Sequence, residues 1–244
     1  MWNGKKVSVI FPTYNEKNSI REAIEEVLST GFVDEVLVVN NNAAPGTSEE
    51  VARTPARELI EPRQRYGRAI RSGFREAVGD YLIVSEPDGT FRGQDVLKLL
   101  AYADNFDYVL GTRTTREMIW KGANMGIFLK WGNWAVAKMA EFLFDATMLT
   151  DCGCTLRLLA RPAYDKLLPY FTRTGNDFGL ELTLLVIRHK IPFVEIPVNY
   201  RRRVGVSSVT GNPIKAFRLG LRMIWMVLKF RAGLMGKKPQ GNTE

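Results

Sequence analysis

The sequence predicts an α/β fold of three layers, in which helices cover both faces of a mostly parallel sheet. Short apolar runs at Val7–Phe11, Val36–Asn40 and Tyr81–Ser85 are typical of strands that are buried on both faces. Between them, Ser19–Thr30 and Arg68–Val78 carry apolar residues at helical spacing. Regular alternation of strand and helix predicts a parallel sheet, and ligands of such sheets bind at the carboxyl ends of the strands.

The rest of the chain continues this alternation. A helical pattern at Asp95–Asp104 precedes a fourth strand at Tyr108–Gly111, and Trp120–Leu149 has helical periodicity with many aromatic residues. Glu181–Lys190 is expected to form another helix, and Phe193–Tyr200 another strand.

Three segments of the chain differ in character. Residues 1–212 carry all the predicted strands and are expected to form one domain. Residues 213–236 contain a long basic amphipathic helix, roughly Ile214–Ala232, and residues 237–244 are expected to be a flexible tail.

Composition excludes several classes of protein. The 244 residues are 45% hydrophobic and 25% charged, which indicates a folded domain rather than a disordered chain. Cys152 and Cys154 are poorly spaced for a mutual disulfide and too few for a zinc site, and a single histidine, His189, argues against a Ser–His–Asp triad. No apolar run approaches the roughly 20 residues that cross a bilayer. The opening MWNGKKVSVIF has no signal-peptide architecture, so we expect a cytoplasmic protein.

The net charge of +8 is concentrated near the C-terminus. From Arg201 onward the chain has ten basic residues against one acidic residue. This bias favours a phosphate-rich partner, but its confinement to one segment and the absence of a nucleic-acid motif argue against nucleic acid. The final helix combines basic and aromatic residues, as membrane-surface helices do. Packing of this helix on the main domain, or on a second copy in a homo-oligomer, remains an open alternative.

Two groups of polar residues follow predicted strands. Phe11–Glu16 joins an aromatic ring to polar groups that can bind a nucleobase, although Asn15 and Ser19 can equally cap the next helix. Glu86 and Asp88 flank a proline and can face one point, where hard cations such as Mg²⁺ or Mn²⁺ bind carboxylates; a solvated turn is the alternative.

Two later segments hold arginines next to small residues. In Asp151–Arg157 a bend is expected to bring the acid and the arginine together. In Arg201–Ser208 arginines, glycine and hydroxyls suit the binding of phosphate, although a run of charge is often only a solvated face.

In order and spacing, these segments resemble the family 2 inverting glycosyltransferases of the GT-A fold, a Rossmann-like α/β/α architecture. Within that family they are most similar to the dolichyl-phosphate mannosyltransferase-like branch, which uses polyprenyl phosphates. The resemblance covers about residues 5–210 and rests on VSVIFPTYNE, GFVDEVLVVNNNAAPGT, RQRYGRAIRSGFREAVGDYLIVSEPDGTF, VLGTR, DCGCTLRLLAR and EIPVNYRRRVGVSS.

The resemblance implies roles for individual residues. Glu86 and Asp88 would hold a divalent metal, Mg²⁺ or Mn²⁺, and the catalytic residues would be Asp88, Arg113 and Arg157, with the arginines clamping phosphates. The nucleotide sugar would be bound by Pro12, Tyr14, Glu16, Asn40, Asn41, Arg203 and Ser207.

The implied reaction is transfer of a hexose, with inversion, from a GDP- or UDP-sugar to a polyprenyl (dolichyl or undecaprenyl) phosphate. The protein would then be peripheral on the inner face of the membrane. A phosphate acceptor needs no general base because it is already anionic at neutral pH. A saccharide or other hydroxyl acceptor would need a carboxylate such as Asp151 or Asp177, of which Asp177 is expected instead to cap a helix.

Some positions depart from the family pattern. Asn40-Asn41 replaces an acidic pair, Glu86 replaces the first aspartate of the metal motif, and Ser208 replaces a lysine. Arg63 and Arg65 stand in place of an asparagine and a glycine. These changes leave open an altered donor or a non-catalytic nucleotide-binding homologue.

Overall fold

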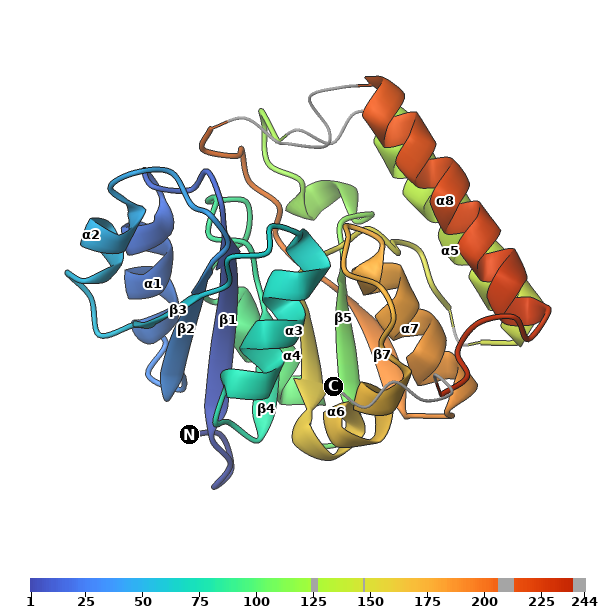
Figure 1. Cartoon of the computed structure of the whole chain (residues 1–244), viewed down its shortest axis with the longest axis horizontal. Coiled ribbons are helices and arrows are strands. Elements are labelled where there is room, and N and C mark those ends of the chain that lie inside the picture. The colour runs from blue at the N-terminus through green and yellow to red at the C-terminus, as the bar shows by residue number, and fades with distance from the viewer. Residues whose placement is uncertain (124–126, 147, 206–212, 239–244) are drawn as a thin grey trace.

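The sheet brings together strands from residue 7 to residue 197 of the chain (Figure 1). The computed structural model describes residues 1–123, 127–146, 148–205 and 213–238, and within these ranges seven strands form one sheet in the order β3-β2-β1-β4-β6-β5-β7. The strands are β1 (Val7–Thr13), β2 (Glu35–Asn40), β3 (Arg57–Ile60), β4 (Tyr81–Val84), β5 (Tyr108–Thr112), β6 (Arg157–Ala160) and β7 (Phe193–Pro197).

All strand pairs except those of β6 are parallel. β6 runs antiparallel to both β4 and β5, with Val84 opposite Arg157 and Leu110 also opposite Arg157. The mostly parallel three-layer α/β fold expected from the sequence is therefore confirmed, with one antiparallel strand inserted in the sheet.

Helices lie on both faces of the sheet (Figure 1). They are α1 (Ile20–Leu28), α2 (Thr47–Val51), α3 (Tyr66–Glu76), α4 (Asp95–Tyr102), α5 (Ile127–Phe144), α6 (Arg161–Leu167), α7 (Phe178–Arg188) and α8 (Pro213–Arg231), with 3₁₀ turns η1 (Arg116–Met118) and η2 (Leu168–Tyr170). The start of α3 lies close to α7, because a Cβ on Gly67 would stand 2.6 Å from the Cβ of Phe178. Only glycine permits this approach, which narrows the space between the two helix starts.

The sequence missed two strands and two helices. β3 has no fully buried residue and therefore lacks the apolar run of the other strands. β6 begins with an arginine and follows a segment of small residues, so it was expected to be a bend. The short helices α2 and α6 were also not predicted.

The two predicted N-caps are confirmed by position but not by a side-chain hydrogen bond. Ser19 and Asp177 occupy the N-cap positions of α1 and α7, but neither side chain caps its helix by a hydrogen bond. The Ser19 hydroxyl donates instead to the Glu16 carbonyl at 3.3 Å, and the Asp177 carboxylate lies 3.8 Å from Arg173.

The long final helix packs on the domain beside α5 and α7, and Figure 1 shows α5 and α8 as an adjacent pair. Its inner face buries Met223, Met226, Val227 and Phe230. Beside this buried face, α8 exposes five large apolar residues: Phe217, Leu221, Ile224, Trp225 and Leu228. The predicted flexible tail falls mostly on residues 239–244, outside the described residues.

Candidate active site

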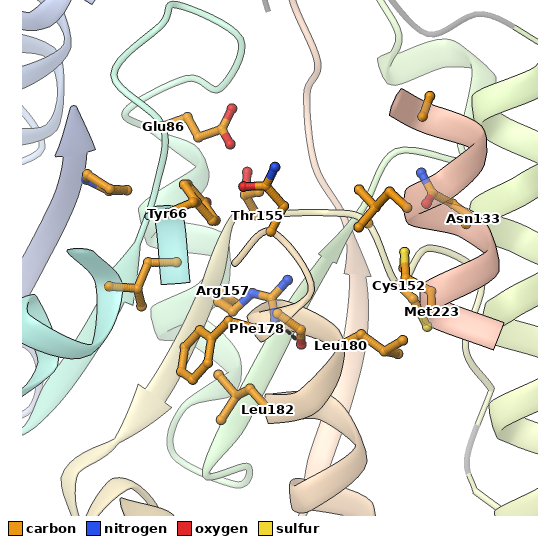
Figure 2. A pocket seen from close by; sticks show the side chains of 18 of the residues that line it. Tyr66, Glu86, Asn133, Cys152, Thr155, Arg157, Phe178, Leu180, Leu182 and Met223 are labelled. Atoms are coloured by element: carbon orange, nitrogen blue, oxygen red, sulfur yellow. Dashed lines mark hydrogen bonds between the residues drawn. The ribbon is translucent and has the colours of Figure 1, made fainter. Parts of the chain in front are cut away.

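A cavity of about 680 Å³ opens at the carboxyl ends of the central strands and extends toward α5, α7 and α8 (Figure 2). Most of the residues expected to bind substrate line it: Pro12, Tyr14, Glu16, Asn41, Glu86, Arg113, Arg157 and Arg203. Asp88 lies fully buried beside Glu86, and Asn40 is not part of the lining. Ser207, which is also predicted to bind the nucleotide sugar, lies outside the described residues.

Glu86 and Asp88 meet the guanidinium of Arg203 just beyond the end of β4. Arg203 Nη2 donates to Glu86 Oε2 at 2.7 Å and forms an ion pair with Asp88 Oδ2. The other carboxylate oxygen of Asp88, Oδ1, accepts hydrogen bonds from the Thr90 amide at 2.9 Å and the Thr90 hydroxyl at 2.5 Å. Asp88 Oδ2 is buried and accepts no hydrogen bond of acceptable geometry within the described part of the chain.

The environment of Glu86 disfavours its charged form. Burial and the adjacent Asp88 raise the pKa of Glu86 to about 8, although Arg203 and Arg113 oppose this shift. A carboxyl group in this position needs added positive charge to become fully ionised at neutral pH.

These two acids fit a divalent cation. Asp88 Oδ2 is a buried carboxylate oxygen without a hydrogen bond. The Glu86 carboxyl and Asp88 Oδ2 both contact Arg203 Nη2, so the two acids lie close together. Hard cations prefer such oxygens, and two carboxylates would leave most coordination positions for water and substrate phosphates.

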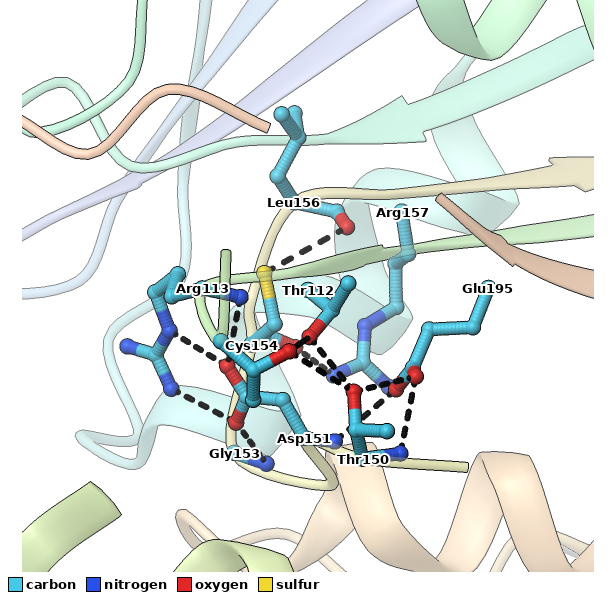
Figure 3. Close-up of polar contacts among 10 residues, drawn as sticks. Thr112, Arg113, Thr150, Asp151, Gly153, Cys154, Leu156, Arg157 and Glu195 are labelled. Carbon is cyan, nitrogen blue, oxygen red and sulfur yellow. Dashed lines mark hydrogen bonds and ion pairs between the residues drawn. The ribbon is translucent and has the colours of Figure 1, made fainter. Parts of the chain in front are cut away.

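Arg113 is held by Asp151 rather than left free at the cavity wall (Figure 3). The Asp151 carboxylate accepts from Arg113 Nε at 2.7 Å and from Nη2 at 3.0 Å. The guanidinium carbon of Arg113 also lies over the ring of Tyr200, 5.1 Å from the ring centroid. Burial alone would lower the pKa of Arg113, but Asp151 raises it well above its usual value. The expectation that Asp151 pairs with Arg157 is therefore corrected: its partner is Arg113.

The loop that carries Asp151 is fixed by Glu195 of β7 (Figure 3). Glu195 accepts hydrogen bonds from the Thr150 amide at 2.7 Å, the Thr150 hydroxyl at 2.6 Å and the Asp151 amide at 2.9 Å. Sequence reasoning did not single out Glu195. Its signal was an acidic residue within the otherwise apolar strand FVEIP.

Arg157 points from β6 into the middle of the cavity (Figure 2). Its guanidinium donates to the Gly179 carbonyl at 2.7 Å, to the Tyr108 hydroxyl at 3.1 Å and to the Cys154 carbonyl. A Cβ on Gly179 would stand 2.8 Å from Arg157 Nη2, so a larger residue here would displace the guanidinium. Among the described residues no carboxylate lies within ion-pair distance of Arg157, which leaves its buried positive charge able to attract an anion.

The side-chain amides of the two asparagines after β2 form hydrogen bonds within the protein. Asn40 donates to Glu58 at 2.8 Å and accepts from the Ala43 amide at 2.8 Å. Asn41 donates to the Glu61 carbonyl at 2.7 Å and accepts from the Arg65 amide at 2.8 Å. Both amides shape the wall of the cavity through the loops they hold.

The turn after β1 offers an open aromatic ring. Glu16 Oε2 accepts from the Tyr14 amide at 2.6 Å and the Asn15 amide at 2.8 Å, which fixes the turn. The Tyr14 side chain is 42% exposed at the cavity mouth. Its ring is therefore available to stack on a planar ligand.

Sequence reasoning missed Tyr66, the first residue of α3. Its ring lines the cavity, and Figure 2 places it between Glu86 and Arg157. Burial, with the nearby carboxyls of Glu86 and Asp88, raises the pKa of Tyr66 well above its usual value. Its hydroxyl is buried near the Glu86 carboxyl but makes no hydrogen bond of acceptable geometry within the described residues. The only sequence signal was an aromatic residue at the start of a glycine-marked helix.

The far end of the cavity is apolar. Figure 2 shows Phe178, Leu180 and Leu182 of α7 on one side, and Met223 of α8 on another. Further apolar lining comes from α5 and α8, through Ala135, Val136, Met139, Phe217, Leu219, Leu221 and Ile224. One cavity thus joins a charged end at the strand termini to an apolar end between three helices.

The fold is similar to solved glycosyltransferase structures. A crystal structure of glucosyl-3-phosphoglycerate synthase from Mycobacterium tuberculosis, in complex with Mn²⁺, UDP and phosphoglyceric acid, matches with a TM-score of 0.72. The match is 16% identical in sequence and covers 94% of this chain and 79% of that chain. At this identity the match bears on the fold alone, and it confirms the expected GT-A architecture.

Sequence comparisons give the family. The chain is 24% identical over 213 residues to the glycosyltransferase AglJ of Haloferax volcanii, covering 86% of this chain and 67% of AglJ. It is 26% identical over 232 residues to an uncharacterized glycosyltransferase of M. tuberculosis, covering 92% of this chain and 99% of that protein. The family model for glycosyl transferase family 2 matches residues 8–168, the part that supplies β1 to β6 and both acids of the charged end. With its GT-A sheet and its acidic pair at the strand ends, this chain belongs to glycosyl transferase family 2.

Proposed function

We propose that this glycosyltransferase transfers a hexose, with inversion, from a nucleoside-diphosphate sugar to a polyprenyl phosphate at the inner face of a membrane. The observation that carries the proposal is the continuity of the cavity. Its charged end suits a sugar diphosphate, and its apolar end suits a hydrocarbon chain. An amphiphilic acceptor whose phosphate lies between the two ends would match this polarity.

The donor would bind at the ends of β1 and β4. Tyr14 would stack on the base, and Arg203 would contact the diphosphate, because a guanidinium binds phosphate oxygens by paired hydrogen bonds. Glu86 and Asp88 would hold Mg²⁺ or Mn²⁺, which neutralises the charge that develops on a leaving diphosphate. The M. tuberculosis synthase of the same fold was crystallised with Mn²⁺ and UDP-glucose, which supports a UDP-sugar as the first donor to test.

The acceptor phosphate would bind at Arg157. This guanidinium lies at the junction of the charged and apolar ends, and no described carboxylate pairs with it. A phosphate there would be attracted by the unpaired charge while its chain extends between α7 and α8. Arg113, oriented by Asp151, would add positive potential beside the same point.

A hydroxyl acceptor is less well supported by the residues present. It would need a carboxylate as general base. Asp151 is fully buried and paired with Arg113, and Asp177 is 6% exposed beside Arg173, so neither is positioned to receive a proton from a bound substrate.

The outer surface of α5 and α8 supports a membrane location. Trp131 and Trp134 of α5 are exposed, as are Trp225 and Leu228 of α8, which do not line the cavity. Arg218, Arg222 and Lys229 stand on the same helix. Basic helices with exposed aromatic residues insert shallowly among lipid headgroups. Within the described residues no helix is long and apolar enough to span a bilayer.

The test is transfer of radiolabel in the presence of vesicles. The purified full chain would be incubated with Mn²⁺, labelled UDP- or GDP-hexoses, and vesicles with or without undecaprenyl or dolichyl phosphate. We expect label in the organic phase only when the polyprenyl phosphate is present. Label that passes only to water-soluble saccharides would refute the lipid acceptor, and the absence of any transfer with every donor would favour a non-catalytic homologue.

A further inference from the structure

Arg203 is surrounded by three acidic side chains that come from different parts of the chain. Its Nη2 contacts Glu86 at 2.7 Å and also Asp88, and its Nη1 lies 3.9 Å from Glu16 Oε1. Glu16 follows β1, the other two acids follow β4, and Arg203 follows β7. The single positive charge of Arg203 therefore lies among three acids at the charged end of the cavity.

The position of this guanidinium conflicts with that of a metal ion. Oδ1 of Asp88 is already occupied by two hydrogen bonds from Thr90. Oδ2 is thus the oxygen that Asp88 can offer to a cation, and Oδ2 is the atom that Arg203 contacts. The same applies to Glu86, whose Oε2 accepts from Arg203. A cation and this guanidinium compete for the same two oxygens.

The backbone around Arg203 would allow the side chain to exchange partners without moving the loop. The Val204 amide donates to the Asp88 carbonyl at 2.8 Å, and the Arg201 amide donates to the Thr90 carbonyl at 2.7 Å. These bonds tie the segment that carries Arg203 to the turn that carries Asp88. The guanidinium therefore stays within reach of the site when it leaves the carboxylates.

We propose that Arg203 is an internal counter-ion that occupies the cation position in the free enzyme, and that metal and donor diphosphate displace it together. The metal takes the oxygens of Glu86 and Asp88, while the guanidinium moves to the incoming diphosphate, so every charge remains paired. Arg203 then makes metal binding depend on nucleotide binding. This inference rests on the proposed function for the metal and for the diphosphate donor.

The coupling follows from the pairing of charges. Metal alone has to displace Arg203 from Glu86 and Asp88 and leaves it only Glu16, whose other carboxylate oxygen already accepts three hydrogen bonds. This loss of partners weakens binding of the metal. Metal with a diphosphate supplies that anion, so each ligand strengthens binding of the other. An enzyme built in this way does not retain a bare metal ion between reaction cycles.

The experiment is titration of Mn²⁺ followed by electron paramagnetic resonance, without nucleotide and with saturating UDP or GDP. The variants are Arg203→Gln, which removes the charge, and Arg203→Lys, which keeps it. Arg202→Gln is the matched control, because Arg202 is the exposed neighbour and forms no ion pair with Glu86 or Asp88 among the described contacts. Circular dichroism and thermal unfolding would verify that each variant is folded.

Without nucleotide, we expect Arg203→Gln to bind Mn²⁺ about tenfold more tightly than the unaltered chain, a typical coupling between two sites. The gain in Mn²⁺ affinity on adding UDP or GDP should shrink in the same variant. Arg203→Lys and Arg202→Gln should behave like the unaltered chain in both titrations.

Equal or weaker Mn²⁺ binding by Arg203→Gln in the absence of nucleotide would overturn the inference, while hexose transfer by the unaltered chain would leave the proposed function standing. A failure of all four proteins to bind Mn²⁺ with either nucleotide would overturn both. If Arg203→Gln does not fold, Arg203→Met, which also removes the charge, takes its place. Tighter Mn²⁺ binding than in the unaltered chain without nucleotide supports the inference, and equal or weaker binding contradicts it.

Discussion

Asp151 and Arg113 form a buried ion pair with two parallel hydrogen bonds, at 2.7 Å and 3.0 Å, across 38 residues of sequence. Asp151 is fully buried, and its loop is held in turn by Glu195. The pair sets the direction of the Arg113 side chain at the cavity wall, so its loss should affect both stability and catalysis.

Replacing Asp151 by Asn should destabilise the protein by about 3–5 kcal/mol, because it leaves the buried Arg113 charge without its partner. Urea unfolding followed by circular dichroism would measure this change. Removing the exposed Arg21–Glu25 pair through Arg21→Ala serves as a control and should leave the unfolding midpoint unchanged. A small loss of stability in Asp151→Asn would mean that Arg113 finds other partners.

Asp88→Asn should lower kcat/KM by about 10²–10³, because the neutral amide no longer stabilises a cation at the leaving diphosphate. Asparagine keeps an oxygen that can accept from Thr90, so the turn should remain folded. Glu22→Gln on α1 removes an exposed carboxylate elsewhere and should leave kcat/KM unchanged. Full activity of Asp88→Asn with Mn²⁺ would contradict the assignment of this acid to the metal.

Arg157→Lys should raise the KM for polyprenyl phosphate by about 10- to 100-fold with little change in the KM for the donor, because lysine cannot reproduce the guanidinium's fixed set of hydrogen bonds. Arg161→Lys is the matched control. Arg161 donates hydrogen bonds to the backbone carbonyls of Phe74, Ala77 and Gly79, and it is not among the residues that line the cavity. An equal rise in both Michaelis constants would indicate that Arg157 has a structural role and does not bind the acceptor.

Tyr66→Phe should leave stability unchanged or slightly raised, because the hydroxyl it removes is buried and makes no hydrogen bond within the described residues. Tyr81→Phe provides the contrast. The Tyr81 hydroxyl accepts from Lys5 at 3.1 Å and donates to the Ala103 carbonyl at 3.2 Å, so its loss should cost about 1 kcal/mol. Thermal unfolding of both variants tests this, and destabilisation of Tyr66→Phe equal to that of Tyr81→Phe would contradict it.

Trp225→Ala should weaken binding to anionic vesicles by roughly tenfold, because a large exposed apolar side chain contributes about 1.5–3 kcal/mol when it is buried. Co-sedimentation with phosphatidylglycerol vesicles measures the partition. Ile60→Ala, at the edge strand β3, removes an exposed apolar side chain away from α8 and should bind as the unaltered chain does. Equal binding by the two variants would indicate that the outer face of α8 does not contact lipid.

The central strands were predictable because their signal is local. β1, β2, β4 and β5 are apolar over nearly their whole length, since a strand covered on both faces has no polar side. The polar residues directly after β1 and β4 could then be assigned to one edge, because parallel strands end together.

β6 was missed because its sequence lacks that signal. It begins with Arg157, is only four residues long, and pairs antiparallel with both neighbours, so it does not fit the pattern of a parallel strand. Glu195 and Tyr66 were missed for a related reason. Their importance depends on Thr150 and Glu86, partners that lie 45 and 20 positions away in the chain.

The sequence by itself determined the α/β class, because short-range patterns of apolar and polar residues encode strands and helices. The resemblance of its motifs to family 2 glycosyltransferases indicated the family and directed attention to the acids at positions 86 and 88. Only the tertiary structure decided which charge meets which: Asp151 with Arg113, and Arg203 with Glu86 and Asp88. The physical reason is that ion pairs form between residues that the sheet brings together over 38 and 117 positions. Strand order, which no local pattern encodes, selects these partners.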